Sequence, residues 1–359
     1  MPDHFNLEQA WENFGYCKLR LLPKEQGFRP IMNLRQHILR GQDGGKASNN
    51  GMLRNIHAVL DYYRTREEEK MGASVICMSK VYERLLGYKQ SLKKQGSLQK
   101  RLFFAKFDIK SCYDSIPHEK LLKVIDDLID KEDFIIQRCD QISLINGAIK
   151  RRFTRMAFPS NDIHISDPLS GSLIVDKVVG YRIERKKILN MIKEHVTRNI
   201  VKVNGRFYQQ WVGVPQGFHL STLLCSFFYA DLDQKCLHYF RNDPSSLLMR
   251  FIDDLLFITT DRHLMDRFIE RIRHGFPEYG ITFNLDKAAT NFNHPLFSNT
   301  NNNVNNKFSW CGMLIDEQAL CVTADYGKLF GVHIGDTLTI DYGAPVVDTF
   351  EKYLQMYEH

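Results

Sequence analysis

The sequence lacks any apolar run that approaches the ~18 residues needed to span a bilayer, and its first residues, MPDH, do not begin a signal peptide. Its eight cysteines contain no CxxC pair and no Cys/His spacing typical of metal ligands, so neither a zinc site nor a disulfide framework is indicated. These absences exclude an integral membrane protein. We expect a soluble, intracellular protein with no membrane partner, whose cysteines are reduced and mostly buried.

The composition is that of a globular protein. Of its 359 residues, 43% are hydrophobic and 25% are charged, and the mean hydropathy is −0.33. At ~150 residues per domain, this length predicts two or three domains. The 48 Lys and Arg residues exceed the 42 Asp and Glu residues, which gives a formal net charge of +6 and a pI near 8.8. This moderate positive charge suits a polyanionic partner without establishing one.

The first hundred residues are predicted to be mostly helical, with one β-hairpin. Residues 16–34 alternate apolar and basic side chains around a Gly-containing turn, KEQG, which is typical of a hairpin. Apolar residues at helical spacing over 53–63 and 81–92 predict two helices. The apolar run FFAKFDI (103–109) predicts a strand, and a turn leads from it into a helix over 121–128.

The remainder of the chain alternates predicted strands and helices. Residues 130–195 mix short apolar runs with basic clusters and are expected to form an inserted subdomain, whose secondary structure the pattern does not predict. From residue 200 we expect a second hairpin, a Gly-containing loop and a long apolar helix near 220–240. A helix ending at Gly275 follows the apolar run 247–259. An Asn-rich loop over 299–306, which need not be ordered, precedes a final β-like piece.

Three aspartates interrupt or close apolar strands. Asp253 and Asp254 lie within LLMRFIDDLLFIT, and Asp108 lies at the end of FFAKFDI. Burying a lone carboxylate is costly unless it is paired or binds a cation, and two adjacent strands would bring all three to one sheet end. Carboxylates are ligands that Mg²⁺ prefers, and two such ions ~3.5–4 Å apart stabilise an in-line phosphoryl displacement. The alternative is a hairpin tip with solvated aspartates.

Three further aspartates are weaker candidates for such a site. They are Asp114, Asp231 and Asp233. Asp114 follows the turn, and the other two fall late in the predicted apolar helix. We expect solvated or capping roles for them.

A phosphoryl-transfer site also needs cations for the phosphates and a wall for the sugar. Lys24 and Arg29 flank the first hairpin loop, where both can reach phosphate oxygens; two exposed hairpin charges are the alternative. Tyr113 has the size to block a ribose 2′-hydroxyl and so select deoxynucleotides, although an isolated tyrosine also suits a core position. Gln216 and Gly217 precede a predicted helix N-terminus, which suits the binding of a nucleotide or template strand.

Several segments resemble the polymerase motifs of reverse transcriptases, and of the telomerase reverse transcriptase family in particular. FDIKSCYDSIP, WVGVPQGFHLSTLLCSFFYADLD and LLMRFIDDLLFIT stand in the order of motifs A, B′ and C. LRLLPKEQGFRPIMN is similar to motifs 1 and 2, GITFNLDKAATNF to motif D, and FSWCGMLID to motif E, the primer grip; VLDYYR and GASV add support. The long interval between Asp108 and Gln216 resembles the insertion in the fingers domain of telomerases. The resemblance covers about residues 15–345.

The resemblance implies an α+β fold of the right-hand polymerase type, with helical fingers and an antiparallel-sheet palm. The fingers would occupy 1–101, and the palm 102–128 and 196–322. The insertion in the fingers domain would occupy 129–195, and the start of the thumb 323–359. The chain would thus be the catalytic core of a larger protein, without the RNA-binding and telomerase-specific domains that precede the fingers in the family.

The resemblance also implies roles for individual residues in RNA-templated DNA synthesis. Two Mg²⁺ ions would be held by Asp108, Asp253 and Asp254, and the primer 3′-hydroxyl would attack the α-phosphate of a dNTP. The residues expected to bind the nucleotide or template are Lys24, Arg29, Tyr113, Gln216, Gly217 and Lys287, the last as a proton donor near the pyrophosphate. The residues expected at the primer are Phe251, Trp310, Cys311 and Gly312. Phe218 and His219 depart from the small polar residue that many relatives have after Gln-Gly.

The implied partners are those of a telomerase catalytic subunit. They are a telomerase RNA template, a single-stranded telomeric DNA primer, dNTPs and accessory telomerase proteins, in a ribonucleoprotein located in the nucleus at chromosome telomeres. A retroelement or intron-type reverse transcriptase is a second hypothesis, since it shares the carboxylates but not the long insertion or the WCG sequence. A non-catalytic polymerase-fold scaffold that binds nucleic acid is a third; the presence of all three carboxylates argues against it.

Overall fold

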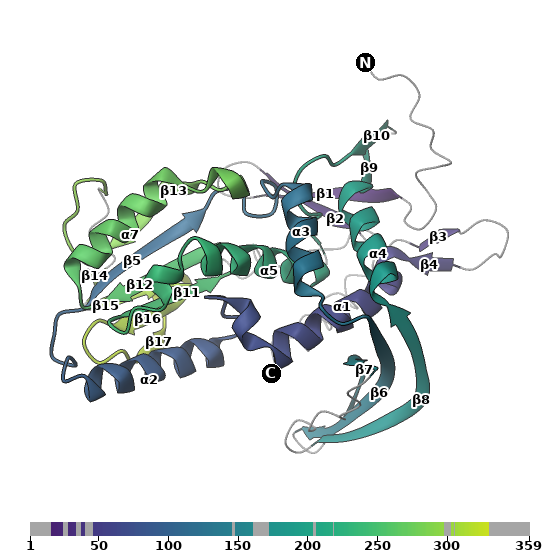
Figure 1. Ribbon diagram of the computed structural model, residues 1–359, viewed down its shortest axis with the longest axis horizontal. Helices are drawn as coiled ribbons and strands as arrows, with labels where there is room; N and C mark the ends of the chain where they lie inside the picture. Colours follow the sequence, from purple (N-terminus) through teal and green to yellow (C-terminus); the bar gives the residue numbers. More distant parts are fainter. Residues whose placement is uncertain are drawn as a thin grey trace.

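The structure is a computed structural model of the chain (Figure 1). It describes residues 16–23, 28–33, 37–39, 46–145, 148–160, 172–203, 206–217, 219–297, 303–304 and 306–329. Among the described helices, none is both long and apolar enough to cross a membrane. All eight cysteines are free, as expected, but only four are buried: Cys17, Cys112, Cys139 and Cys225.

The centre of the fold is an antiparallel sheet in the order β11-β12-β5-β13. Its strands are β11 (Ser246–Phe251), β12 (Asp254–Thr259), β5 (Phe103–Ile109) and β13 (Phe283–Thr290). Neighbouring side chains of a strand point to opposite faces, so Phe104 and Phe107 enter different hydrophobic clusters. The sheet is therefore buried on both faces, which explains why its strands are apolar runs.

Helices cover one face of this sheet. They are α5 (His219–Lys235), α6 (His238–Arg241) and α7 (Arg262–His274), and α3 (His118–Leu128) packs on α5. Helix α7 buries one apolar stripe, and its Phe268 ring stacks on Phe257 of β12 with centroids 4.1 Å apart. Gly275 ends this helix with a φ of 65°, as its sequence position predicted; η3 (Pro277–Tyr279) follows.

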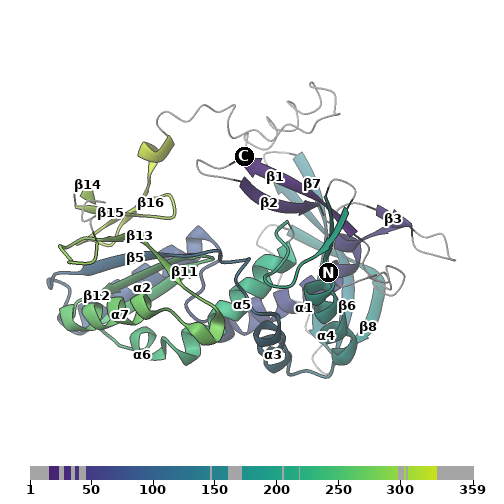
Figure 2. The ribbon, with the colours of Figure 1, turned by 90° about the horizontal axis from the view of Figure 1, so that it is seen from above.

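The opposite face is covered by helix α2 (Met78–Lys94) and a small C-terminal sheet. Figure 2 shows the small sheet on the side away from α6 and α7. The small sheet contains β14 (Asn303–Val304), β15 (Lys307–Trp310), β16 (Met313–Asp316) and β17 (Val322–Ala324), and η4 (Tyr326–Leu329) follows. Part of the Asn-rich segment that we expected to be a loop is thus the short strand β14, because it pairs with β15.

The N-terminal part contains the first predicted hairpin and both predicted helices. The hairpin is β1 (Tyr16–Pro23) and β2 (Phe28–Asn33), followed by β3 (His37–Leu39), β4 (Lys46–Ser48), α1 (Asn49–Arg66), η2 (Glu68–Met71) and α2 (Met78–Lys94). The second predicted hairpin, β9 (Ile200–Val203) and β10 (Arg206–Gln209), joins the first through parallel pairing of β9 with β1.

The segment whose structure the sequence did not predict is a sheet of three long strands that projects from the rest of the fold (Figure 1). These are β6 (Asp133–Ile145), β7 (Ala148–Pro159) and β8 (Ser172–Glu184), in the order β7-β6-β8. Helix α4 (Arg185–Thr197) leads from this sheet back to β9. The sheet lies between α3 and α4 in the chain, as expected for an inserted subdomain.

Candidate functional site

Three aspartates lie at one end of the central sheet. Asp108 and Asp254 are directly opposite each other in the register of β5 and β12. Asp253 lies in the tight turn between β11 and β12, and its carbonyl oxygen accepts a hydrogen bond from the Ile109 amide at 3.0 Å. All three side chains are half-buried. The structure therefore brings together the three carboxylates that the sequence singled out.

Two other side chains contact these carboxylates. The ammonium group of Lys287 lies 3.3 Å from Oδ2 of Asp108, at an irregularity in the pairing of β13 with β5. The Cys311 thiol donates to Oδ2 of Asp254 at 3.4 Å. Lys287 and Cys311 come from β13 and from the turn after β15, so elements far apart in the sequence converge on one sheet end.

The carboxylates fit divalent magnesium in chemical kind, since Mg²⁺ prefers hard oxygen ligands. Within the described ranges, no group of three or more His, Cys, Asp and Glu side chains is arranged to hold a metal ion. In this structure Asp108 instead contacts Lys287, and Asp254 contacts Cys311.

A buried ion pair supports the turn that carries Asp253. Arg250 and Asp233 are 1% and 0% exposed, and Nη2 of Arg250 donates to Oδ2 of Asp233 at 3.0 Å. The expectation of a solvated or capping role for Asp233 is wrong, because α5 packs this carboxylate directly under β11. Asp231 is also not solvated: it accepts a hydrogen bond from the Tyr279 hydroxyl at 2.6 Å. Asp114 is exposed, as expected.

The turn after β5 packs on the loop before α5. The Tyr113 carbonyl accepts a hydrogen bond from the Val214 amide at 2.8 Å, and the Tyr113 hydroxyl lies 3.4 Å from the Thr222 hydroxyl. The Tyr113 side chain is half-buried, and this burial raises its pKa to about 12. Gly213 has a φ of 86°, and a Cβ there would lie 2.6 Å from the Tyr113 carbonyl oxygen. Tyr113 is therefore held as a neutral phenol on a rigid loop.

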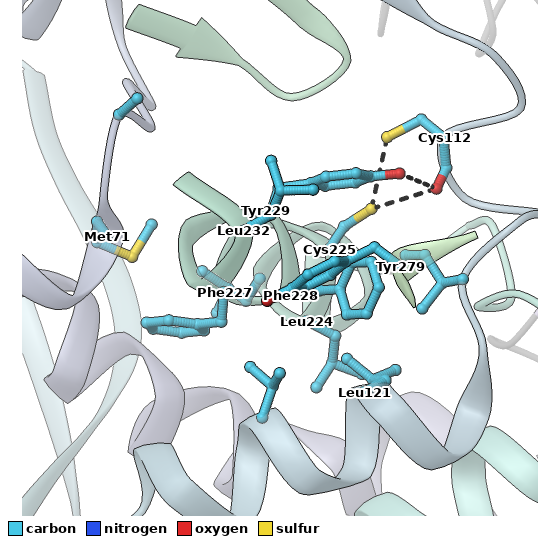
Figure 3. Packing of buried hydrophobic residues seen from close by; sticks show 14 of the residues in the cluster. Met71, Cys112, Leu121, Leu224, Cys225, Phe227, Phe228, Tyr229, Leu232 and Tyr279 are labelled. Atoms are coloured by element: carbon cyan, nitrogen blue, oxygen red, sulfur yellow. Dashed lines mark hydrogen bonds between the residues drawn. The ribbon is translucent and has the colours of Figure 1, made fainter. Parts of the chain in front are cut away.

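Figure 3 shows the apolar core beneath this turn. The Tyr229 hydroxyl donates to the Cys112 carbonyl oxygen at 2.8 Å, and the thiols of Cys112 and Cys225 are 3.7 Å apart. Helix α5 thus holds the backbone next to Tyr113 by a hydrogen bond as well as by packing.

Gln216 and Gly217 connect this loop to the first hairpin. The Gln216 carbonyl oxygen accepts a hydrogen bond from the Met32 amide at 2.8 Å, and its side chain donates to Asp114 at 3.1 Å. Gly217 has a φ of 132°, and a Cβ there would lie 2.3 Å from the Met32 carbonyl oxygen. Only glycine permits this close approach.

The structure does not describe the side chains of two residues that were predicted to bind phosphate. Lys24 lies outside the described residues. The Arg29 backbone pairs with Leu22 in the first hairpin, but its side chain also lies outside the described part of the structure.

Two of the residues expected at the primer, Phe251 and Cys311, lie next to Asp254. Phe251 pairs with Asp254 across the β11–β12 hairpin. Cys311 and Gly312 form the turn between β15 and β16 with φ angles of 47° and 74°, a geometry that suits the right-handed twist of a hairpin. Trp310 is only 1% exposed and packs in the cluster below the sheet. Trp310 therefore anchors this turn from beneath.

Comparison with known proteins agrees with this architecture. The family described as reverse transcriptase (RNA-dependent DNA polymerase) matches residues 179–315. Telomerase reverse transcriptases from Rattus norvegicus and Arabidopsis thaliana are 29% and 28% identical to the chain over 367 and 362 residues, covering 92% and 90% of it. The chain covers 31% of each of those proteins, so it spans about a third of the length of the curated relatives it matches.

Solved structures show the same fold. Telomerase from Candida tropicalis in complex with a TWJ fragment of telomeric RNA has a TM-score of 0.63 at 19% identity, covering 96% of this chain and 49% of that one. Telomerase from Candida albicans in a complex with such a fragment has a TM-score of 0.62 at 20% identity, covering 99% and 52%. The α+β fold of the reverse transcriptase type, which the resemblance implied, is confirmed.

Proposed function

We propose that this chain, which resembles telomerase reverse transcriptase over nine-tenths of its length, is the catalytic core of an RNA-templated DNA polymerase that adds deoxynucleotides to chromosome 3′ ends. The observation that carries the proposal is the register of the central sheet. It places Asp108 opposite Asp254, with Asp253 in the adjoining turn. Such a cluster at one sheet end suits nucleotidyl transfer with two metal ions.

In this function Asp108, Asp253 and Asp254 would hold two Mg²⁺ ions, whose chemistry would be to stabilise negative charge on the oxygens of an in-line displacement. The primer 3′-hydroxyl loses its proton to solvent water and attacks the α-phosphorus of the dNTP; a new P–O bond forms, the bond from the α-phosphorus to the α,β-bridging oxygen breaks, and pyrophosphate leaves. Lys287 next to Asp108 donates a proton to the departing pyrophosphate. Lys24 and Arg29 bind the triphosphate from the hairpin that Gln216 contacts.

Two further groups position the substrates. We assign the Tyr113 ring to block a ribose 2′-hydroxyl, and Gln216 with Gly217 to bind the nucleotide and the template. Phe251, Cys311 and Gly312 line the primer side, and Trp310 fixes their turn. Steric exclusion by a ring on a rigid loop requires no titration, which agrees with the raised pKa of Tyr113.

We assign the parts of the chain accordingly. Fingers occupy 1–101, palm 102–128 and 196–322, the insertion 129–195, and the start of the thumb 323–359. The template is a telomerase RNA, the primer is single-stranded telomeric DNA, and accessory proteins complete a ribonucleoprotein at nuclear telomeres. In support, similar solved structures are described as telomerases in complex with a fragment of telomeric RNA.

The test is primer extension by the full-length protein that contains this chain, with Mg²⁺, dNTPs and a supplied RNA–DNA hybrid. Asp254→Ala is expected to abolish extension while hybrid binding stays within about twofold, because the carboxylate acts on the metal ions rather than on the duplex. Asp127→Asn, at an exposed aspartate of α3, is the matched control. Extension by Asp254→Ala at the wild-type rate would refute the polymerase, and processive copying of a long external template would favour a retroelement-type enzyme.

A further inference from the structure

We infer that Arg250, paired with Asp233, is a positioning residue for catalysis: its guanidinium sets the turn that carries Asp253 and ties this turn to the segment Gly72–Val75. The inference rests on the proposed function, and it adds a role that neither the motif resemblance nor the three carboxylates supply. Arg250 touches none of the reacting atoms, so any effect on the reaction must pass through Asp253.

The turn needs support because its backbone is strained. Ile252, directly before Asp253, has a φ of 57°. A β-branched residue in this left-handed region is unfavourable and persists only where the surroundings hold it. Nη1 of Arg250 donates to the Ile252 carbonyl oxygen at 3.2 Å, and the Ile109 amide holds the Asp253 carbonyl at 3.0 Å. Arg250 therefore holds one side of the strained peptide.

The guanidinium itself is fixed on every side. Nε and Nη2 donate to one carboxylate oxygen of Asp233 at 3.2 and 3.0 Å, and Nη2 also donates to the Ser226 carbonyl at 3.3 Å. The Tyr229 ring lies 5.3 Å from the guanidinium carbon. Both members of the pair are buried, so the strand and helix α5 cannot shift without exposing or separating two charges.

The same carboxylate reaches a third element. Oδ2 of Asp233 accepts a hydrogen bond from the Ala73 amide at 3.1 Å, and the Arg250 backbone exchanges hydrogen bonds with Ala73 and Val75, both at 2.8 Å. A Cβ on Gly72 would lie 3.0 Å from Cβ and Oδ2 of Asp233, so this approach depends on glycine. The segment Gly72–Val75 thus acts as an extra strand beside β11.

A second arginine holds that segment from helix α2. The Arg84 guanidinium donates to the carbonyl oxygens of Gly72, Ala73 and Ser74 at 3.3, 3.0 and 3.1 Å. A continuous chain of polar contacts therefore runs from α2 through Gly72–Val75 and Asp233 to Arg250 and the Asp253 turn. Through these contacts, helix α2 and the segment after η2 set the position of the Asp253 carboxylate relative to the central sheet.

A buried ion pair is a poor source of stability, because an apolar pair of similar volume is often equally stable. The effect of the ion pair on the position of a catalytic group can be larger, since a displacement of about 1 Å at a reacting group can lower the rate about 100-fold. The pair is therefore expected to affect turnover more than folding, and variants that keep the fold can separate the two effects.

The experiment uses the full-length protein and three variants. Arg250→Lys keeps the charge but cannot reach both Asp233 and the Ile252 carbonyl. Arg250→Met combined with Asp233→Asn removes both charges, and the Asn amide oxygen still accepts from Ala73, so no unpaired charge remains buried. Asp231→Asn is the matched control, because Asp231 lies on the same helix and contacts Tyr279 and Lys235 rather than Arg250.

We expect both Arg250 variants to lower kcat by about 10- to 100-fold. The KM for dNTP and hybrid binding should stay within about twofold, and the Mg²⁺ concentration for half-maximal rate should rise several-fold, because Asp253 is displaced. Asp231→Asn should keep the wild-type kcat and Mg²⁺ dependence. Rates are expressed per folded, hybrid-binding molecule, so a loss of folding does not register as a loss of kcat.

Wild-type kcat and Mg²⁺ dependence in the folded double variant would overturn the inference and leave Arg250 a packing residue. An equal effect in Asp231→Asn would also overturn it, since the effect would then belong to helix α5 as a whole. Asp253→Ala is assayed in parallel: if it extends primers like the wild type, the proposed function fails, whereas an inactive Asp253→Ala with a normal double variant refutes the positioning role alone.

Discussion

The ammonium group of Lys287 lies 3.3 Å from Oδ2 of Asp108, across the pair of strands β13 and β5. Asp108 is one of the three carboxylates proposed to hold Mg²⁺, so Lys287 and a divalent cation compete for the same oxygen. Lys287 is 64% exposed, so in the absence of metal this ion pair contributes little to stability. We expect its consequence to be kinetic: metal binding to Asp108 would release the Lys287 ammonium, which could then act on the pyrophosphate.

Substitutions of Lys287 should separate the effect of its positive charge from the effect of its proton donation. Lys287→Ala is expected to lower kcat by about 100-fold, the scale of general acid catalysis, and to lower the Mg²⁺ concentration for half-maximal rate because the competing cation is gone. Lys287→Arg keeps the charge but is a poor proton donor, so its Mg²⁺ dependence should stay near wild type while kcat still falls. Steady-state extension at varied Mg²⁺ measures both; equal kcat in Lys287→Arg and wild type would contradict a proton-donor role.

Tyr113 should control sugar selection through the size of its ring. Tyr113→Ala is expected to raise ribonucleotide incorporation relative to deoxynucleotide incorporation by about tenfold or more, on the scale of a lost steric block. Tyr113→Phe keeps the ring and loses only the hydroxyl, whose contact with Thr222 at 3.4 Å is long, so its selectivity should be unchanged. Single-nucleotide extension with paired dNTP and rNTP tests this, and an effect as large in Tyr113→Phe would point to the hydroxyl instead.

We expect any residue other than glycine at position 217 to impair nucleotide binding and stability. In Gly217→Ala the new Cβ would lie 2.3 Å from the Met32 carbonyl oxygen, so the Gln216–Met32 hydrogen bond must break. We expect a several-fold rise in the KM for dNTP and a loss of stability of roughly 1–3 kcal/mol. Gly96→Ala is the control, because Gly96 has a φ of 66° but nothing within 4 Å of its Cβ position. The same KM in both variants would show that close approach at Gly217 is unimportant.

His195 should make the stability of the chain depend on pH. Burial lowers its pKa from 6.5 to about 4 in the folded state. In the unfolded chain His195 is protonated below about pH 6.5, whereas in the folded chain it is protonated only below about pH 4. The free energy of unfolding therefore falls as the pH decreases from about 6.5 to about 4. The difference corresponds to about 3 kcal/mol.

This dependence is measured by denaturant unfolding between pH 7 and pH 4. The wild type should lose about 3 kcal/mol more than His195→Gln over this range, because the variant lacks the titrating group. The same loss in both proteins would show that His195 is not the group responsible.

Much of the site was predictable from the sequence because its signals are local. Asp253 and Asp254 stand out since they interrupt an apolar run, and Asp108 since it closes one. The hairpins near 16–34 and 200–209 were predicted by their turn residues, and α7 by its apolar spacing. Lys287 and the WCG turn were found through motif resemblance, and the structure places both beside the carboxylates.

The insertion was not predictable because its strands obey no simple alternation. The pairing of β6 with β8 shifts register by two residues between Gln137 and Cys139, which interrupts the regular ladder of the two strands. Large apolar residues at its far end, such as Ile149 and Phe153, are exposed rather than buried. Alternation of apolar and polar residues predicts a strand when one face is buried along the whole strand. In these strands burial decreases toward the far end, so the alternation is lost.

The sequence by itself determined which strands are apolar, where they turn and which carboxylates end them, because these are properties of neighbouring residues. Only the tertiary structure decided which distant groups meet: Asp233 with Arg250, Lys287 with Asp108, Cys311 with Asp254. Each of these pairs joins elements brought together by sheet register and helix packing. Long-range pairing depends on the whole fold, so a buried aspartate such as Asp233 cannot be told from a solvated one until its partner is known.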